Sequence, residues 1–109
     1  MAKKQFEFHD TDNIPWEPVK GHPGAYQRIL NKDLETSSIT KLVKYDPNVK
    51  INEVLRHDFY EEVYIISGGQ KFRNFTIGAG DYAYRHPGMV HGPCVVLPEG
   101  CLMLVHVTY

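Results

Sequence analysis

The sequence predicts an all-β fold, a small sandwich or barrel, from three observations. Seven prolines and nine glycines punctuate the 109 residues at short intervals, which leaves little room for long helices. No segment sustains apolar residues at helical spacing. The apolar segments are instead short and rich in Val, Ile, Tyr, Phe and Thr, as β-strands are.

Each expected strand is an apolar run that ends at a recognisable turn signal. The runs cover residues 25–30, 37–45, 62–67, 70–77, 80–86, 94–97 and 102–109. Between them lie residues that favour turns: Asn31-Lys32-Asp33, Asp46-Pro47-Asn48, Gly68-Gly69, Gly78-Ala79-Gly80, His86-Pro87-Gly88 and Pro98-Glu99-Gly100. Short strands at nearly regular spacing are typical of antiparallel sandwiches and barrels.

Residues 1–24 are less regular and are expected to form an extended N-terminal arm, on the barrel of residues 25–109 or on a partner subunit. Trp16 is expected to anchor this arm by packing, and His9 and His22 are expected to be exposed. The N-terminus carries two lysines but no apolar segment of the kind that a secretory signal needs. A cytoplasmic location is therefore expected.

Charge and cysteine content exclude several classes of function. The formal net charge is −1, without the basic patch that nucleic-acid or membrane-surface binding requires. No apolar run approaches the roughly 20 residues that span a bilayer. Cys94 and Cys101 are too few for a disulfide scaffold, and both are expected to be structural.

Candidate metal ligands lie where strands are expected to begin and end. His57 and Glu62 bracket a turn that leads into a strand, and His91 follows the turn "HPGMV". Two imidazoles and one carboxylate suit non-haem Fe(II) and are acceptable to Mn, Ni, Co or Zn. The spacing alone leaves another interpretation open, in which His57 and His91 are polar turn residues and Glu61 and Glu62 begin an exposed strand.

Two segments around these residues resemble the motifs of the cupin superfamily. The second cupin motif reads G, five residues, P-x-G, two residues, H. Gly80, His86-Pro87-Gly88 and His91 match it, except that His86 replaces the first proline. The first motif reads H-x-H, three or four residues, E, six residues, G. His57, Glu62 and Gly69 match it, with Leu55 where the earlier histidine is expected.

The remainder of the chain resembles small single-domain cupins, which are similar to the cupin domain of zinc-dependent anti-sigma factors and to β-diketone dioxygenase-like proteins. The resemblance implies a small antiparallel jelly-roll barrel, a divalent metal (Fe, Zn, Mn or Ni) near its mouth and a homodimer. It assigns His57, Glu62 and His91 as metal ligands. Strand alternation does not decide between Glu61 and Glu62, whereas the spacing to Gly69 favours Glu62.

Two further residues are candidates for a catalytic role. Tyr64 shares a strand face with Glu62, so its hydroxyl is a candidate hydrogen-bond donor at the mouth, although it also suits a barrel-filling role. His86 is a candidate proton shuttle, with an exposed turn histidine as the alternative. Arg28 and Arg85 are candidate partners for an anionic substrate, or solvated strand residues.

The function expected from these features is that of a metal-dependent enzyme acting on a small organic molecule. With iron the site suits a dioxygenase-type oxidoreductase, and with zinc, nickel or manganese it suits isomerase, lyase or hydrolytic chemistry. The alternative is a non-catalytic barrel that binds or senses a small molecule. No nucleic-acid or membrane partner is expected.

Overall fold

The computed structural model describes residues 7–109, and its regular structure is almost entirely antiparallel β-sheet, as predicted. One 3-10 turn, η1 (Thr11–Asn13), precedes the strands. The strands are β1 (Glu17–Pro18), β2 (Ala25–Lys32), β3 (Ile39–Tyr45), β4 (Lys50–Ile51), β5 (Leu55–Arg56), β6 (Tyr60–Lys71), β7 (Thr76–Gly78), β8 (Tyr82–Arg85), β9 (Val90–His91) and β10 (Cys94–Thr108).

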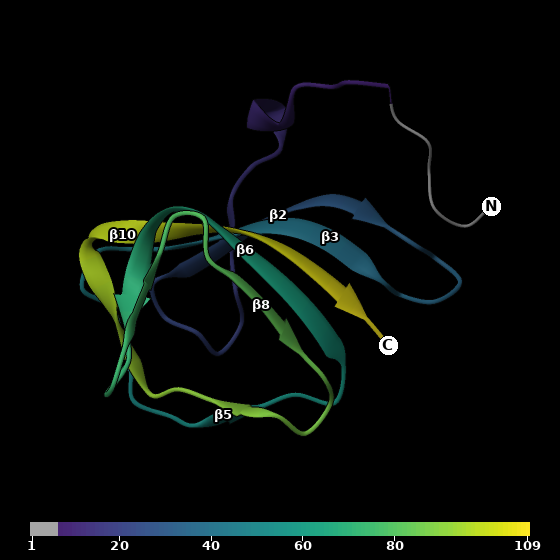
Figure 1. The fold of residues 1–109 in the computed structure, drawn as a ribbon. Helices are drawn as coiled ribbons and strands as arrows, with labels where there is room; N and C mark the ends of the chain where they lie inside the picture. The colour runs from purple at the N-terminus through teal and green to yellow at the C-terminus, as the bar shows by residue number, and fades with distance from the viewer. Residues whose placement is uncertain (1–6) are drawn as a thin grey trace.

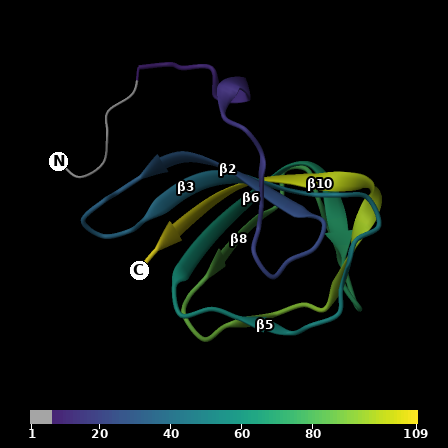
Figure 2. The same cartoon turned by 180° about the vertical axis from the view of Figure 1, so that it is seen from behind.

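The strands form one large curved sheet and one small sheet that together enclose an interior (Figure 1). The large sheet has the order β1-β2-β3-β10-β6-β7, and β4 and β8 pair with β10 and β6. The small sheet pairs β5 with β9. In both views, β5 lies on the side of the barrel opposite β2, β3 and β10 (Figure 2).

Alternation along the long strands separates an apolar inner face from a mixed outer face. In β6, Val63 and Ile65 are 5% and 1% exposed, whereas Tyr64 and Ile66 are 47% and 44% exposed. The inner residues of β3, β6 and β10 pack together as the core. This cluster consists of Val43, Val63, Ile65, Val96, Cys101, Met103, Val105 and Val107.

Two turns that the sequence predicts are absent, because strands continue through them. Gly68-Gly69 lies within β6, and Pro98-Glu99-Gly100 lies within β10, where the pairing of the two strands shifts register. A Cβ built on Gly68 would lie 1.9 Å from the Gly100 carbonyl oxygen. Glycine is therefore needed here because the two backbones approach closely. Its φ of +68° also favours glycine, since residues with a Cβ rarely adopt positive φ.

The segment before β2 contacts the outer face of the large sheet. Glu17 and Pro18 pair with β2. The Trp16 ring lies 4.3 Å from both the Arg28 guanidinium carbon and Lys44 Nζ, in the geometry of cation–π contacts. The division of the chain into an arm and a barrel at residue 24 stays a prediction. Among the described residues no helix is long and apolar enough to cross a membrane.

Candidate metal centre

Three potential metal ligands from separate segments converge inside the barrel. His57 follows β5, Glu61 is near the start of β6, and His91 ends β9. One nitrogen from each histidine and one carboxylate oxygen lie within 4.8 Å of one another. Two imidazoles and one carboxylate at this separation form a donor set that can hold a divalent cation.

Backbone pairing in the small sheet places the two histidines next to each other. Leu55 is directly opposite His91 in the β5–β9 pair. The Gly88 amide donates to the His57 carbonyl oxygen over 2.9 Å. Gly88 has a φ of +85°, which a side chain would disfavour. The "HPG" turn therefore brings β9 back beside β5.

Aromatic contacts fix the orientation of the His57 ring. The His57 ring stacks on Phe59, with centroids 4.5 Å apart and planes inclined by 16°. Its centroid is 4.9 Å from that of His91. The edge of Phe59 in turn contacts Tyr109, at 5.7 Å between centroids. These contacts favour the observed orientation of the imidazole.

His91 is held in the form that a metal ligand requires. Burial, together with the nearby Arg85 and His57, lowers the pKa of His91 to about 4, so the imidazole is neutral at physiological pH. Its Nε2 atom is buried and has no hydrogen-bond partner among the described residues. A buried nitrogen without a partner is unfavourable, and a metal ion at this position would satisfy it.

Glu61 is held by an arginine on the neighbouring strand. Arg85 Nη1 donates to Glu61 Oε1 over 2.9 Å, and the two side chains are 16% and 15% exposed. Glu61 and Arg85 are direct partners in the β6–β8 register. The ion pair therefore orients the carboxylate toward the histidines and balances its charge.

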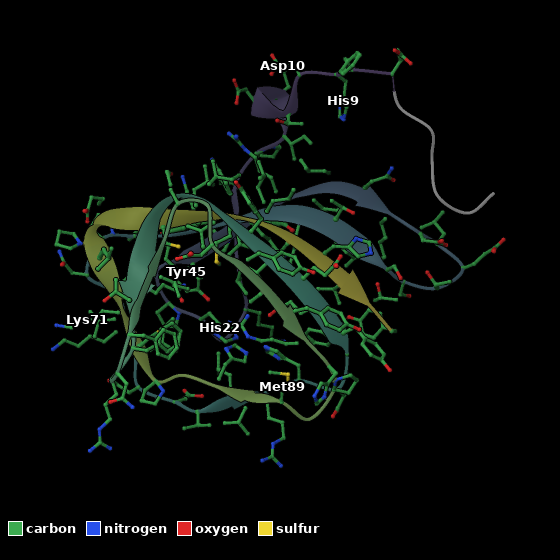
Figure 3. All side chains as sticks on the ribbon, viewed as in Figure 1. His9, Asp10, His22, Tyr45, Lys71 and Met89 are labelled. Carbon is green, nitrogen blue, oxygen red and sulfur yellow. The ribbon has the colours of Figure 1, made fainter. Side chains whose placement is uncertain are left out.

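The three donors lie in the wall of a cavity of about 680 Å³ that occupies the barrel. Its volume is within the range of small-molecule sites. His22 and Tyr45 line it from neighbouring segments, since Ala25, three residues after His22, pairs with Tyr45 (Figure 3). Most of the remaining wall is apolar, including Val43, Phe59, Ile65, Phe72, Met103 and Val105.

The structure places Glu61 beside the histidines instead of Glu62, which the motif spacing favoured. Glu62 is exposed and accepts a hydrogen bond of 2.7 Å from the Tyr82 hydroxyl. The reason is the pairing of β6, which directs Val63 and Ile65 into the core. Alternation then turns Glu61 inward and Glu62 outward.

The two candidate catalytic residues do not lie at this cavity. Tyr64 is 47% exposed on the outer face of β6. His86 is exposed in the turn before β9, where its Nδ1 is 3.1 Å from the Pro87 carbonyl oxygen. Neither belongs to the cavity wall. The expectation that His22 is exposed was wrong, since it is half-buried and lines the cavity.

Leu55 and Lys41 also line the cavity, and Leu55, but not Lys41, was considered from the sequence. Leu55 occupies the place of the expected histidine and lines the cavity two residues before His57. Lys41 lies on the inner face of β3, between Ile39 and Val43 in the alternation. That alternation is visible in "SSITKLVKY" and could have identified Lys41 as an inward lysine.

Replacing Glu61 with glutamine is expected to lower metal affinity by at least about tenfold, because removing even an outer contact of a metal ligand typically has this effect. Glu62→Gln is the matched control and should leave the affinity unchanged, since Glu62 lies on the outer face. Calorimetric titration of the chelator-treated proteins with Zn²⁺ measures the metal affinity of both variants. A larger loss in Glu62→Gln would contradict the assignment of Glu61.

Comparisons with solved structures place the fold among cupins. The chain superposes with a TM-score of 0.72 and 17% identity on an RmlC-like cupin from Shewanella frigidimarina, covering 99% of this chain and 94% of that one. For an acetylacetone dioxygenase from Acinetobacter johnsonii, the TM-score is 0.72 and the identity is 18%. The alignment covers 96% of this chain and 74% of the dioxygenase chain. These similarities confirm the predicted jelly-roll fold.

A third similar structure is the complex of Rhodobacter sphaeroides SigE with the anti-sigma ChrR, with a TM-score of 0.68 and 19% identity. The alignment covers 92% of this chain and 52% of the matched chain, so this chain spans about half its length. No curated protein matches the sequence. The model of the ChrR cupin-like domain family matches residues 4–108, and the chain therefore belongs to this family of cupins.

Proposed function

We propose that the protein is a metal-dependent cupin enzyme that acts on a small organic molecule as a dioxygenase-type oxidoreductase. The observation that carries this proposal is the convergence of His57, Glu61 and His91 on the wall of a largely apolar cavity. His91 Nε2 has no hydrogen-bond partner among residues 7–109, which supports a metal ion as its partner. Fe, Zn, Mn and Ni are all compatible with this donor set.

The side chains of the cavity would prepare a substrate for reaction. A bound divalent metal would act as a Lewis acid and, if it were iron, would also supply redox chemistry. Arg85 holds the Glu61 carboxylate in one orientation, and Phe59 does the same for the His57 ring. A substrate that fills the space between the apolar walls would displace water, which would strengthen polar interactions at the site.

Oxygen consumption tests the dioxygenase activity. Protein loaded anaerobically with Fe(II) should consume oxygen when a panel of β-diketones, including acetylacetone, is added. Zn²⁺-loaded protein and Fe(II)-loaded His91→Ala are the controls, and both should be inactive. Oxygen consumption that is equal in the wild type and His91→Ala would contradict the proposal.

The second candidate function is a non-catalytic barrel that binds or senses a small molecule. The match to the ChrR cupin-like family favours it, because a solved neighbour is an anti-sigma protein in complex with SigE. Metal binding without turnover of any substrate in the panel would support this function. Turnover without oxygen consumption would instead indicate an isomerase or lyase.

The expected homodimer and the expected cytoplasmic location stay predictions. Sedimentation equilibrium of the purified protein measures the first, and a mass of twice 12.5 kDa is the expected result.

A further inference from the structure

Lys41 is a charged residue in an otherwise apolar part of the barrel wall. It lies on the inner face of β3, where the neighbouring inward residues are Ile39 and Val43. Across the sheet it pairs with Val105, which is 2% exposed. Lys41 is half-buried, and a lysine that is withdrawn from water on an apolar face is usually paired with an anion.

No carboxylate is paired directly with Lys41 in the described part of the chain. Lys41 Nζ donates over 2.9 Å to Gln27 Oε1, a neutral acceptor. Gln27 Nε2 in turn donates to Glu17 Oε1 over 3.2 Å. The two ion pairs within 4.0 Å among residues 7–109 are Arg28–Asp12 and Arg85–Glu61, and Lys41 belongs to neither.

The charge environment leaves Lys41 incompletely compensated. Burial lowers the pKa of Lys41, whereas the more distant Glu61 and Glu17 raise it. Glu61, the carboxylate nearest the candidate metal ligands, is already engaged by Arg85. The carboxylate of Asp81 accepts the Gly78 amide in an exposed turn. The cavity wall therefore offers a cation without a directly paired anion.

We propose that the ligand of this cavity is an organic anion with an apolar body, whose anionic group binds the ammonium group of Lys41. This inference rests on the proposed function in one respect, namely that the cavity is the substrate site. It specifies the class of substrate: a carboxylate, sulfonate or similar anion whose hydrocarbon portion contacts the apolar walls. Lys41 is then a specificity-determining residue on the side of the cavity formed by β3.

Two fluorescent probes that differ mainly in charge test this proposal. The anionic probe is 8-anilinonaphthalene-1-sulfonate, and the neutral probe is N-phenyl-1-naphthylamine. Titrations use the chelator-treated 109-residue protein, so the result does not depend on a bound metal. The wild type should bind both probes and should bind the anionic probe more tightly.

Lys41→Met keeps most of the side-chain volume and removes the charge. It should weaken binding of the sulfonate probe by about tenfold, as expected for loss of an ion pair worth about 1.4 kcal/mol, and should leave binding of the neutral probe unchanged. Lys41→Arg should retain binding of both probes. Lys71→Met is the control, because Lys71 is exposed and points away from the barrel (Figure 3).

Three results would overturn the proposal. The first is unchanged sulfonate binding in Lys41→Met, and the second is an equal loss of both probes in that variant while Lys41→Arg binds normally. The third is absence of binding of either probe to the wild type. Metal content is measured on separate samples. A protein that binds no metal but shows Lys41-dependent sulfonate binding would contradict the proposed function and leave the proposed anion site standing.

Discussion

Replacing His91 with alanine is expected to lower the affinity for a divalent metal by at least about 100-fold, the upper end of the loss typical of contacts outside the ligand set. His91 supplies the buried Nε2 atom that has no partner among residues 7–109. Its depressed pKa of about 4 leaves it neutral, so metal binding requires no proton release from this residue. Elemental analysis of untagged protein, before and after dialysis, measures the loss.

His86→Ala is the matched control for this experiment. His86 lies five positions before His91 in the same turn region and is exposed, so its removal should leave the metal content at the wild-type level. If His91→Ala retains metal like the wild type, or if both variants lose it equally, His91 is not a ligand.

Replacing Gly68 with alanine is expected to destabilise the protein by at least about 3 kcal/mol, at the upper end of typical single-residue effects. The new Cβ would lie 1.9 Å from the Gly100 carbonyl oxygen and 2.6 Å from the carbonyl carbon. These are backbone atoms of β10, so β6 and β10 would have to separate. Urea unfolding of the chelator-treated protein measures the change in free energy of unfolding.

Gly80→Ala separates this steric effect from backbone strain. Gly80 also has a positive φ, +91°, but a Cβ added to it would have no neighbouring atom within 4 Å. Its replacement should therefore cost only about 1 kcal/mol, the lower end of the strain range. Equal losses in the two variants would show that close approach of β6 and β10 is not what Gly68 permits.

Most of the long strands could be predicted because their apolar residues and flanking turns are local features. The predicted strand 25–30 lies within β2, and the predicted strand 37–45 includes all of β3. The continuity of β6 and β10 could not be predicted, because Gly68-Gly69 and Pro98-Glu99-Gly100 have the composition of turns. Their place within strands depends on the contact between Gly68 and Gly100, which is a long-range feature.

The two histidines of the candidate site could be identified from the motifs, whereas the acid could not. Both faces of β6 carry apolar residues, since Tyr64 and Ile66 alternate with Val63 and Ile65. Which face is buried depends on packing against β10, where Met103 and Val105 are opposite Ile65 and Val63. Strand alternation therefore identifies Glu61 only after the core is known.

The most direct test of the metal site is an anomalous-diffraction map of crystals grown with Mn²⁺ or Zn²⁺. The site described above predicts a single strong peak inside the barrel, about 2.0–2.2 Å from one nitrogen each of His57 and His91 and from a Glu61 oxygen. A peak beside Glu62 on the outer face, or no peak at His57 and His91, would contradict it.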